Sequence, residues 1–523
     1  MNNNDYWILF TRKIRESLHI LQHVQTKQCQ IAADSDYSSW ASTVDRADWK
    51  YIGLLPPVYP ERLGSQAFLA AHQVRFPYVV GEMANGIATA RMVIAAVKAG
   101  MMGFFGAAGL MPDVIEKNLH AIQTALGSHA GGWGSNLIHS PQEPALEGRV
   151  VDLYVHYGVE RISASAYMSL TPHIVYCAAK GLTVGVNGEI IRRRHILAKV
   201  SRPETAQLFM SPPPTDLLDA LVRSGKLTVQ EAQLAANIPV AQDITVEADS
   251  GGHTDNRPLV ALFPTLFNLA QSIQSKYNYP QPIRLGAAGG LGTPASVAAA
   301  FSLGAAYVLT GSINQSAVES GLSEEGRMLL AKAGVADVVM APASDMFELG
   351  VKLQVLQRGC LFAARANKLY ELYTRYDAIE AIPEQDRRKL ETQIFAADLS
   401  EIWERTKQFF STRDAGQITL AEQDPKHKMA LIFRWYLGCS SHWAIQGDEK
   451  RKADYQIWCG PAMGAFNAWV ADSFLENIQA RTIEQISRNL LEGAAIIQRC
   501  QQLRSYGFPV PETAFHYSPE LLA

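Results

Sequence analysis

The 523-residue sequence lacks the features that mark secreted, membrane-spanning and zinc-binding proteins. Its six cysteines are scattered, with no C-x-x-C pair and no spacing typical of a zinc site. It has no apolar run long enough to cross a membrane as a helix, and its N-terminal segment lacks an apolar stretch followed by a small-residue cleavage site. We therefore expect a cytoplasmic protein with reduced cysteines, no bound metal and no membrane partner.

An excess of one charge is also absent, because 47 basic residues are balanced by 50 acidic ones. Such a chain has no overall field that attracts nucleic acid or an anionic membrane, so we expect no nucleic-acid partner. Apolar residues make up 48% of the sequence, which is enough to bury a substantial core. The length accommodates two or three domains, or one large barrel with additions.

A G-x-G-x-x-G fingerprint is missing, which disfavours a nicotinamide-binding Rossmann domain. The sequence has instead short β-rich apolar runs that alternate with helix-like segments, typical of βα units around a parallel sheet. Eight such runs predict an α/β fold, a (β/α)8 TIM barrel. The predicted strands are residues 77–83, 101–106, 133–138, 161–167, 195–200, 244–249, 283–288 and 307–312. A ninth run, 182–187, is either a strand or half of a hairpin, so a doubly wound open sheet is the alternative.

Three segments are additions to this pattern. Residues 1–75 form an N-terminal extension that leads into the barrel, which we place at residues 76–345. Within the barrel, about residues 204–240 read as a proline-bounded helical insertion that is too long for an ordinary βα connection. After about residue 345 the strand pattern stops, and we expect residues 346–523 to form a helical C-terminal region packed on the barrel.

Two loops carry residues suited to chemistry. The seventh predicted strand runs into Gly289 and Gly290 before a proline-started helix, and the eighth ends at Gly311 and Ser312. Glycines at a helix N-terminus let backbone N–H groups approach a phosphate, although ordinary barrel turns also need glycine. His253 follows two glycines in "EADSGGHTDNRPL" (247–259), where it is either a buried loop histidine or a residue placed to meet a substrate.

Longer motifs connect these loops to a known family. The segments "GEMANGIATARMVIAAVKAGMMGFFGAAGL" (81–110), "AKVSRPETA" (198–206), "EADSGGH" and the glycine loop resemble FMN-dependent barrels, which include nitronate monooxygenases and flavin-type enoyl reductases. The C-terminal segments "DMFELGVKLQVLQRG" (345–359) and "RWYLGCSSHWAIQGDEKRKADYQIWCGPAMGAFNAWV" (434–470) are more specifically similar to the PfaD family. That family comprises trans-acting enoyl reductases of bacterial polyunsaturated fatty acid synthases and related polyketide synthases.

The resemblance implies where FMN would bind. Met83 and Ala84 would place their backbone against the flavin ring, and Asn136 would make a polar contact to FMN. Lys199 would approach the N1 and C2 carbonyl edge and stabilise the anionic reduced flavin, unless it is a solvent-facing lysine. Gly289, Gly290, Gly311 and Ser312 would hold the phosphate.

The resemblance also implies a reaction. NADPH, preferred over NADH, would reduce the flavin, and an enoyl thioester on an acyl carrier protein would then be saturated. His253 would lie over the flavin face and donate the proton, or it would only orient the substrate while water supplies the proton.

Two departures from the simpler members put nitronate oxidation in doubt. Glu82 stands where those enzymes often have proline, and "TDNRPL" follows His253. Arg257 in that segment either contacts a phosphate of the carrier arm or of NADPH, or pairs with Asp255 or Asp249. The alternatives are a nitronate monooxygenase and a non-catalytic flavoprotein that assembles a synthase. The insertion and the helical tail are candidates for carrier docking, for closing the barrel or for a homodimer surface.

Overall fold

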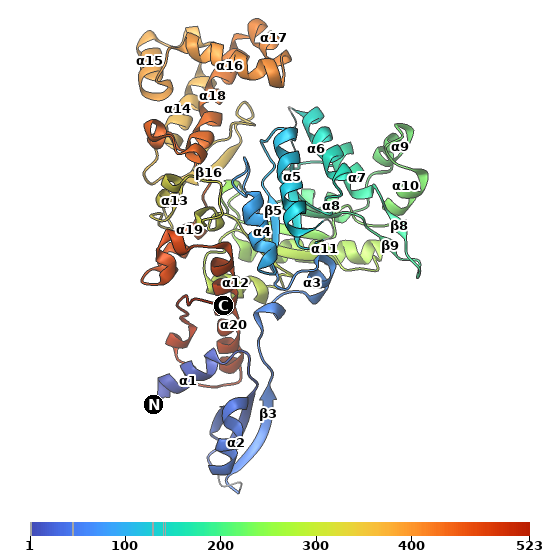
Figure 1. The fold of residues 1–523 in the computed structure, drawn as a ribbon, viewed down its shortest axis with the longest axis vertical. Helices are drawn as coiled ribbons and strands as arrows, with labels where there is room; N and C mark the ends of the chain where they lie inside the picture. The colour runs from blue at the N-terminus through green and yellow to red at the C-terminus, as the bar shows by residue number, and fades with distance from the viewer. Residues whose placement is uncertain (1–2, 44–46, 128–129, 140, 142, 523) are drawn as a thin grey trace.

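The computed structural model describes residues 3–43, 47–127, 130–139, 141 and 143–522, and a closed barrel lies at its centre (Figure 1). Eight parallel strands close in the order β10-β11-β13-β14-β4-β5-β6-β7. Each overlaps one predicted run, so the TIM barrel is confirmed and the open sheet is wrong. The strands are β4 (Tyr78–Val80), β5 (Met102–Phe105), β6 (Trp133–Ile138), β7 (Arg161–Ser165), β10 (His195–Val200), β11 (Asp243–Glu247), β13 (Arg284–Ala288) and β14 (Val308–Thr310).

Amphipathic helices follow the barrel strands and cover the outside of the sheet. In α4, for example, the Thr89 side chain accepts a hydrogen bond from the Met92 N–H and starts the helix, whose face with Met92, Val93 and Ala96 is buried. The helices are α4 (Ala90–Lys98), α5 (Pro112–Leu126), α6 (Pro144–His156), α7 (Pro172–Ala179), α8 (Pro203–Met210), α11 (Leu259–Tyr277) and α12 (Pro294–Ser302). Most begin with proline at the first turn, where no backbone N–H is needed.

The ninth apolar run is half of a hairpin. Strands β8 (Thr183–Val184) and β9 (Ile190–Ile191) pair with each other in a separate two-stranded sheet. The helical insertion is shorter than predicted, because α8 is the ordinary barrel helix after β10. The added elements are α9 (Thr215–Arg223) and α10 (Val229–Ala235), a helical hairpin that packs on α7.

The N-terminal extension forms a small sheet and three helices. Its elements are α1 (Asn3–Arg12), β1 (Leu18–His23), β2 (Cys29–Ala33), α2 (Asp34–Thr43), β3 (Trp49–Leu55) and α3 (Gln66–His72), with strand order β2-β1-β3. Helix α1 and the sheet share a hydrophobic core with α20 (Ile483–Ser505), which in turn packs on α12. Figure 1 shows this sheet at the opposite end of the molecule from α15 to α17.

The expectation that strands stop after residue 345 is wrong. Strands β15 (Val338–Pro342) and β16 (Lys352–Leu356) form an antiparallel sheet with β12 (Gly252–His253), which belongs to the loop after β11. Four of the five β16 residues are buried, so the strand shows no alternation of apolar and polar side chains that would predict it. Its pairing with β12 links a barrel loop to the C-terminal region.

Most of the remaining chain is helical, as predicted. A helical unit, residues 362–446, shares a hydrophobic core with the β15–β16 hairpin and stands at one end of the barrel (Figure 1). It comprises α14 (Phe362–Arg375), α15 (Glu384–Lys389), a π-helical turn (Leu390–Phe395), α16 (Leu399–Arg413), α17 (Gly416–Gln423) and α18 (Pro425–Gln446). Helix α13 (Glu324–Leu330) precedes this unit, and α19 (Ala462–Val470) and α20 follow it and return the chain to the barrel.

Candidate active site

A cavity of about 650 Å³ lies between the carboxyl ends of the barrel strands and the helical unit. Its size falls within the range of about 300–1,000 Å³ typical of small-molecule sites. The carboxyl end of the strands is also where TIM barrels carry their active sites. The residues that the resemblance assigned to the flavin, to its phosphate and to proton transfer all line this cavity, namely Met83, Ala84, Asn136, Lys199, His253, Gly289, Gly290, Gly311 and Ser312.

The glycine loop after β13 forms an open cradle at one side of the cavity. Gly289 and Gly290 have φ angles of 88° and 72°, in the left-handed region that favours glycine. A Cβ atom on Gly289 would lie 2.7 Å from the Asp249 carbonyl oxygen, whereas one on Gly290 would meet no atom within 4 Å. Within the described part of the chain, the N–H groups of Gly289, Gly290 and Gly311 have no acceptor. The cradle therefore has room and donors for an anion beside the N-terminus of α12.

Lys199 does not face solvent. Its Nζ lies 3.2 Å from Glu82 Oε1 and 3.0 Å from Glu247 Oε1, and its side chain is only 15% exposed. Burial disfavours the charged amine, but the carboxylates of Glu247 and Glu82 raise the pKa of Lys199 above its usual range. One cation between two carboxylates leaves this side of the cavity with a net negative charge. Glu82, which stands where the simpler members often have proline, is thus an ion-pair partner of Lys199.

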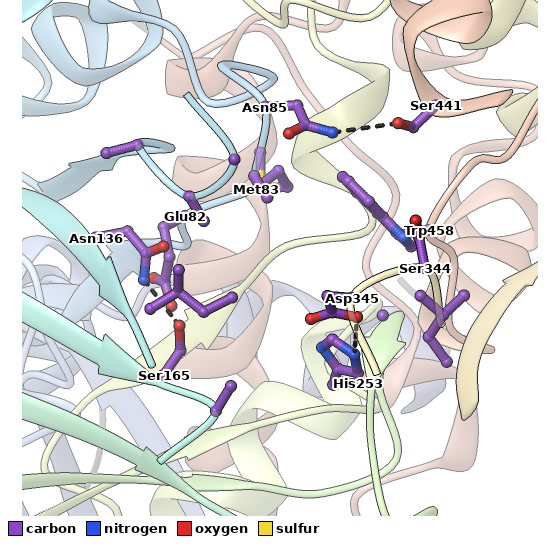
Figure 2. Close-up of a pocket in the computed structure, with 18 of the residues that line it drawn as sticks. Glu82, Met83, Asn85, Asn136, Ser165, His253, Ser344, Asp345, Ser441 and Trp458 are labelled. Carbon is purple, nitrogen blue, oxygen red and sulfur yellow. Dashed lines mark hydrogen bonds and ion pairs between the residues drawn. The ribbon is translucent and has the colours of Figure 1, made fainter. Parts of the chain in front are cut away.

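His253 points at a carboxylate that the sequence did not reveal. Its Nε2 lies 3.3 Å from Oδ1 of Asp345, a residue of the loop between β15 and β16 (Figure 2). Burial lowers the pKa of His253, but the nearby Asp345 carboxylate raises it, and the net shift is upward. The histidine side chain is 30% exposed, but its Nε2 is buried against Asp345, where the contact is an ion pair and not a well-aligned hydrogen bond. Nδ1 is therefore the ring nitrogen left for a ligand.

The loop that carries His253 is fixed by the C-terminal region. His253 pairs with Leu353 and Gly252 with Gln354 across the β12–β16 ladder. The Gln354 side chain donates hydrogen bonds of 2.8 Å to the Asp249 carboxylate and to the Ser250 carbonyl. In the sequence, only the family resemblance of the segment that begins at Asp345 indicated that the residues around β16 matter for the site.

Asn136 and Asn85 are anchored at the rim of the cavity (Figure 2). The Asn136 side-chain amide donates to the Ser163 carbonyl and to Ser165 Oγ, both at 3.0 Å. Asn85 has a φ of 55° and donates to Ser441 Oγ of α18 at 3.2 Å, so it joins the first barrel loop to the helical unit. A non-glycine residue in the left-handed region is uncommon and is frequent at functional sites.

Arg257 is outside the main cavity. Among the described ion pairs it has no partner, because Asp255 binds Arg202 instead, with an Nη2–Oδ1 distance of 2.8 Å. The Arg257 carbonyl accepts a hydrogen bond from the Asp249 N–H, and its side chain is exposed beside a second, shallower pocket. The predicted pairing of Arg257 with Asp255 or Asp249 is therefore wrong.

Comparison with known proteins shows the family to which the chain belongs. A component of the polyunsaturated fatty acid synthase of Thraustochytrium sp. (strain ATCC 26185 / S-3) is 44% identical over 467 residues, which are 87% of this chain and 31% of that protein. The enoyl reductase domain of MlnA, from the macrolactin biosynthesis cluster of Bacillus amyloliquefaciens, is 37% identical with a TM-score of 0.81, over 85% of this chain and 99% of that domain. This chain belongs to the PfaD family of enoyl reductases.

Other PfaD relatives are longer than this chain. Polyketide biosynthesis protein PksE of Bacillus subtilis (strain 168) is 44% identical over 453 residues, which are 87% of this chain but 58% of PksE. The chain thus spans between 22% and 58% of the length of the curated relatives that it matches.

The helical unit of this PfaD protein has a match of its own. Residues 376–455 match the family described as acyl-carrier-protein S-malonyltransferase, inserted helical domain. Among the residues that the structure describes, no helix combines the length and apolarity needed to cross a membrane.

Proposed function

We propose that this protein is a trans-acting enoyl reductase that uses FMN and NADPH to saturate the α,β double bond of enoyl thioesters on an acyl carrier protein. The observation that carries the proposal is the His253–Asp345 pair, which presents an imidazole to the same cavity as the glycine cradle. A flavin reductase of enoyl thioesters needs both an anion site and a proton donor in one cavity. The likeness to the MlnA enoyl reductase domain over nearly all of its length supports the same conclusion.

The residues around the cavity fit FMN. The Gly289–Gly290 turn and Gly311 offer free backbone donors for the phosphate, and Gly290 leaves room for it. Met83, Ala84 and Asn136 line the part of the cavity next to the first strands, where the resemblance places the ring. When bound, FMN supplies hydride transfer from NADPH to the β-carbon of the enoyl thioester.

His253 is the proposed proton donor. The Asp345 carboxylate raises the pKa of His253, so a larger fraction of the imidazole is protonated at neutral pH. With Nε2 directed at Asp345, the transferable proton sits on Nδ1 and reaches the α-carbon as the thioester enolate forms. The β12–β16 ladder holds the ring in one orientation, which lowers the entropic cost of that transfer.

The charge cluster around Lys199 modifies the earlier expectation for this residue. A lone lysine would stabilise the anionic reduced flavin, but here Glu82 and Glu247 offset its charge. We assign the cluster the role of setting how readily the cofactor accepts electrons, with Lys199 favouring reduction and Glu82 opposing it.

The carrier-bound substrate follows from the relatives and from the helical unit. Components of polyunsaturated fatty acid synthases and polyketide biosynthesis proteins are the relatives found, and residues 376–455 resemble a domain inserted in an acyl-carrier-protein transferase. Both similarities support a partner that presents its acyl chain on a carrier arm. The helical unit faces the cavity, so it is placed to meet such an arm.

Anaerobic stopped-flow absorbance tests the proposal. The flavin-loaded protein is reduced with NADPH or NADH and then mixed with crotonyl acyl carrier protein, for wild type, His253→Ala and the control His120→Ala. His120 is exposed on α5 and does not line the cavity. We expect NADPH to reduce the flavin faster than NADH does. The enoyl carrier should then reoxidise the flavin rapidly and give the saturated product in wild type and in His120→Ala, but not in His253→Ala. Reoxidation by oxygen and a nitronate, without any response to the enoyl carrier, would refute the proposal in favour of a monooxygenase.

A further inference from the structure

The cavity extends beyond the barrel loops to a surface of the helical unit, here called the helical wall. Helix α16 contributes Thr406, Phe409, Phe410 and Arg413 to it, and α18 contributes Leu431, Trp435, Gly438 and His442. In both helices these positions recur at intervals of one turn, as in a helix face that packs against a core. Here this face of α16 and α18 lines the cavity and, within the described part of the chain, is not covered by a further helix or strand.

The helical wall is apolar where it meets the cavity. Phe409, Phe410 and Trp435 give it aromatic surface, and Leu431 is fully buried. The Thr406 hydroxyl donates to the Ile402 carbonyl at 2.7 Å, so its polar hydrogen is satisfied within its own helix. Trp435 is supported from behind by Phe395 and Trp443, with ring centroids 6.3 Å and 6.0 Å away.

The cations on this side of the cavity are already paired. Arg413 makes two hydrogen bonds to the Glu143 carboxylate, at 2.6 Å and 3.0 Å, and so joins α16 to the residue before α6. Arg434 lies 3.0 Å from Glu348. Among the described cavity-lining residues of the helical unit these are the only arginines or lysines. A ligand rich in phosphate, such as a nicotinamide dinucleotide, therefore finds no unpaired cation there, whereas a hydrocarbon needs none.

The helical wall begins next to the proposed proton donor. The nearest atom to a Cβ on Gly438 would be Ser344 Oγ, at 3.7 Å, and Ser344 precedes Asp345 in the chain. The β15–β16 loop and α18 touch at this point, because Ser344 Oγ donates a hydrogen bond to the Arg434 carbonyl at 3.4 Å. Gly438 and Ser344 both line the cavity, so the cavity itself connects the His253–Asp345 pair with the apolar surface. A substrate whose double bond lies at His253 would direct the rest of its chain along this part of the cavity.

We propose that the helical wall is the binding site for the acyl chain of the enoyl thioester beyond its double bond, and that it determines which chain lengths are reduced. The inference rests on the proposed function, which it extends to the substrate class. Each methylene group moved from water to such a surface is worth roughly four-fold in affinity. A long saturated or unsaturated chain would therefore gain far more from the wall than a four-carbon chain.

The test compares crotonyl-pantetheine with trans-2-dodecenoyl-pantetheine in variants of the wall. Gly438→Phe adds a large side chain to the part of the cavity beside Ser344, and Phe410→Ala removes apolar surface in case the first variant folds poorly. Ser411→Phe adds the same bulk to an exposed position of α16 that does not line the cavity. Flavin content and thermal unfolding establish that each variant is folded. Calorimetry of saturated dodecanoyl-pantetheine binding gives a readout that needs no turnover.

We expect Gly438→Phe to lower the ratio of dodecenoyl to crotonyl kcat/KM by roughly ten-fold or more, which is the loss of about two methylene contacts. Phe410→Ala lowers the ratio less, and Ser411→Phe leaves it unchanged. Dodecanoyl binding weakens in parallel. An unchanged ratio in both wall variants, or a rise only in the KM for NADPH, would overturn the inference. If wild type binds dodecanoyl-pantetheine through the wall but reduces neither enoyl thioester, the proposed function fails and the acyl site stands.

Discussion

Oδ1 of Asp345 lies 3.3 Å from Nε2 of His253, although one residue belongs to a barrel loop and the other to the hairpin that follows the barrel. The same hairpin supplies β16, which pairs with the backbone of His253. Orientation and charge of the histidine are thus both set from outside the (β/α)8 core. A barrel without this hairpin would lack both controls.

Asp345→Asn should narrow the pH range of the proton-transfer half-reaction. Asp345 raises the pKa of His253, so the amide variant lowers that pKa and deprotonates the imidazole at a lower pH. The basic limb of the pH profile for flavin reoxidation by crotonyl carrier protein should move to lower pH. One pKa unit would give about a ten-fold loss at pH 8 and little loss at pH 6.

The control for that prediction is Asp337→Asn, which removes a half-buried carboxylate at the opposite end of β15, where it pairs with Arg358. Its pH profile should match wild type. A loss of Asp345→Asn activity that is equal at all pH values would instead mean that Asp345 only holds the loop in place.

The sequence predicted one half of this pair and missed the other for a physical reason. His253 stands out because two glycines precede it and an apolar strand leads into it. Asp345 has no such local pattern, and its partner is fixed only by the antiparallel pairing of β12 with β16. Pairings between distant segments depend on the closed fold and leave no periodicity in either segment.

Glu82→Gln and Lys199→Met should shift the midpoint potential of bound FMN in opposite directions. Glu82 is buried against Lys199, so its neutralisation leaves more positive charge beside the site and should raise the potential. Loss of the lysine charge should lower it. Shifts of roughly 30 mV, equivalent to about 1.4 kcal/mol for two electrons, are expected. Equilibrium dye titration under anaerobic conditions measures both, and a shift of the same sign in the two variants would contradict the assignment.

Gly290→Ala should weaken FMN binding by roughly ten-fold beyond its cost in stability. A left-handed φ angle costs a non-glycine residue about 1 kcal/mol, and the added methyl group would enter the open side of the cradle. Gly225→Ala is a matched control, because Gly225 has the same φ of 72° and equally open surroundings, and it does not line the cavity. Flavin fluorescence titration should separate the two variants, while thermal unfolding should not. Equal FMN affinities would mean that the phosphate binds elsewhere.

The barrel and its glycine loops were predictable because burial imposes a regular pattern on each strand and helix. The charged contacts between side chains could not be predicted from the sequence. Arg257 looked like a partner for Asp255 in sequence, yet Arg202 is the residue that reaches that carboxylate. Lys199 was predicted without an ion-pair partner, whereas it contacts Glu247 of the neighbouring strand β11 and Glu82 of the loop after β4, on the opposite side of the barrel. Side-chain partners across a barrel depend on strand register, which the order of residues along the chain does not reveal.

Asp243→Asn should destabilise the fold without altering the cavity. Asp243 is fully buried at the amino end of β11, where Arg284 binds its carboxylate at 2.6 Å and 2.7 Å and His72 of α3 lies 3.0 Å away. An amide leaves the buried Arg284 without its counter-charge, which typically costs about 3–5 kcal/mol. Asp152→Asn, which breaks the exposed pair with Lys226, should cost less than about 1 kcal/mol. Urea unfolding at pH 7 measures both changes.

The ion pairs of Asp243 also predict how the free energy of unfolding depends on pH. Although burial opposes ionisation, His72 and Arg284 hold the pKa of Asp243 well below its usual range. Its contribution to stability is therefore complete above the unfolded pKa near 4 and is lost only as pH falls through the lower folded value. The difference in unfolding free energy between wild type and Asp243→Asn should stay constant from pH 8 to pH 7, where His72 is neutral in both states. A difference that grows from pH 8 to pH 7 would mean that the folded protein takes up a proton on this carboxyl group, and hence that the carboxylate is not ionised in the folded protein.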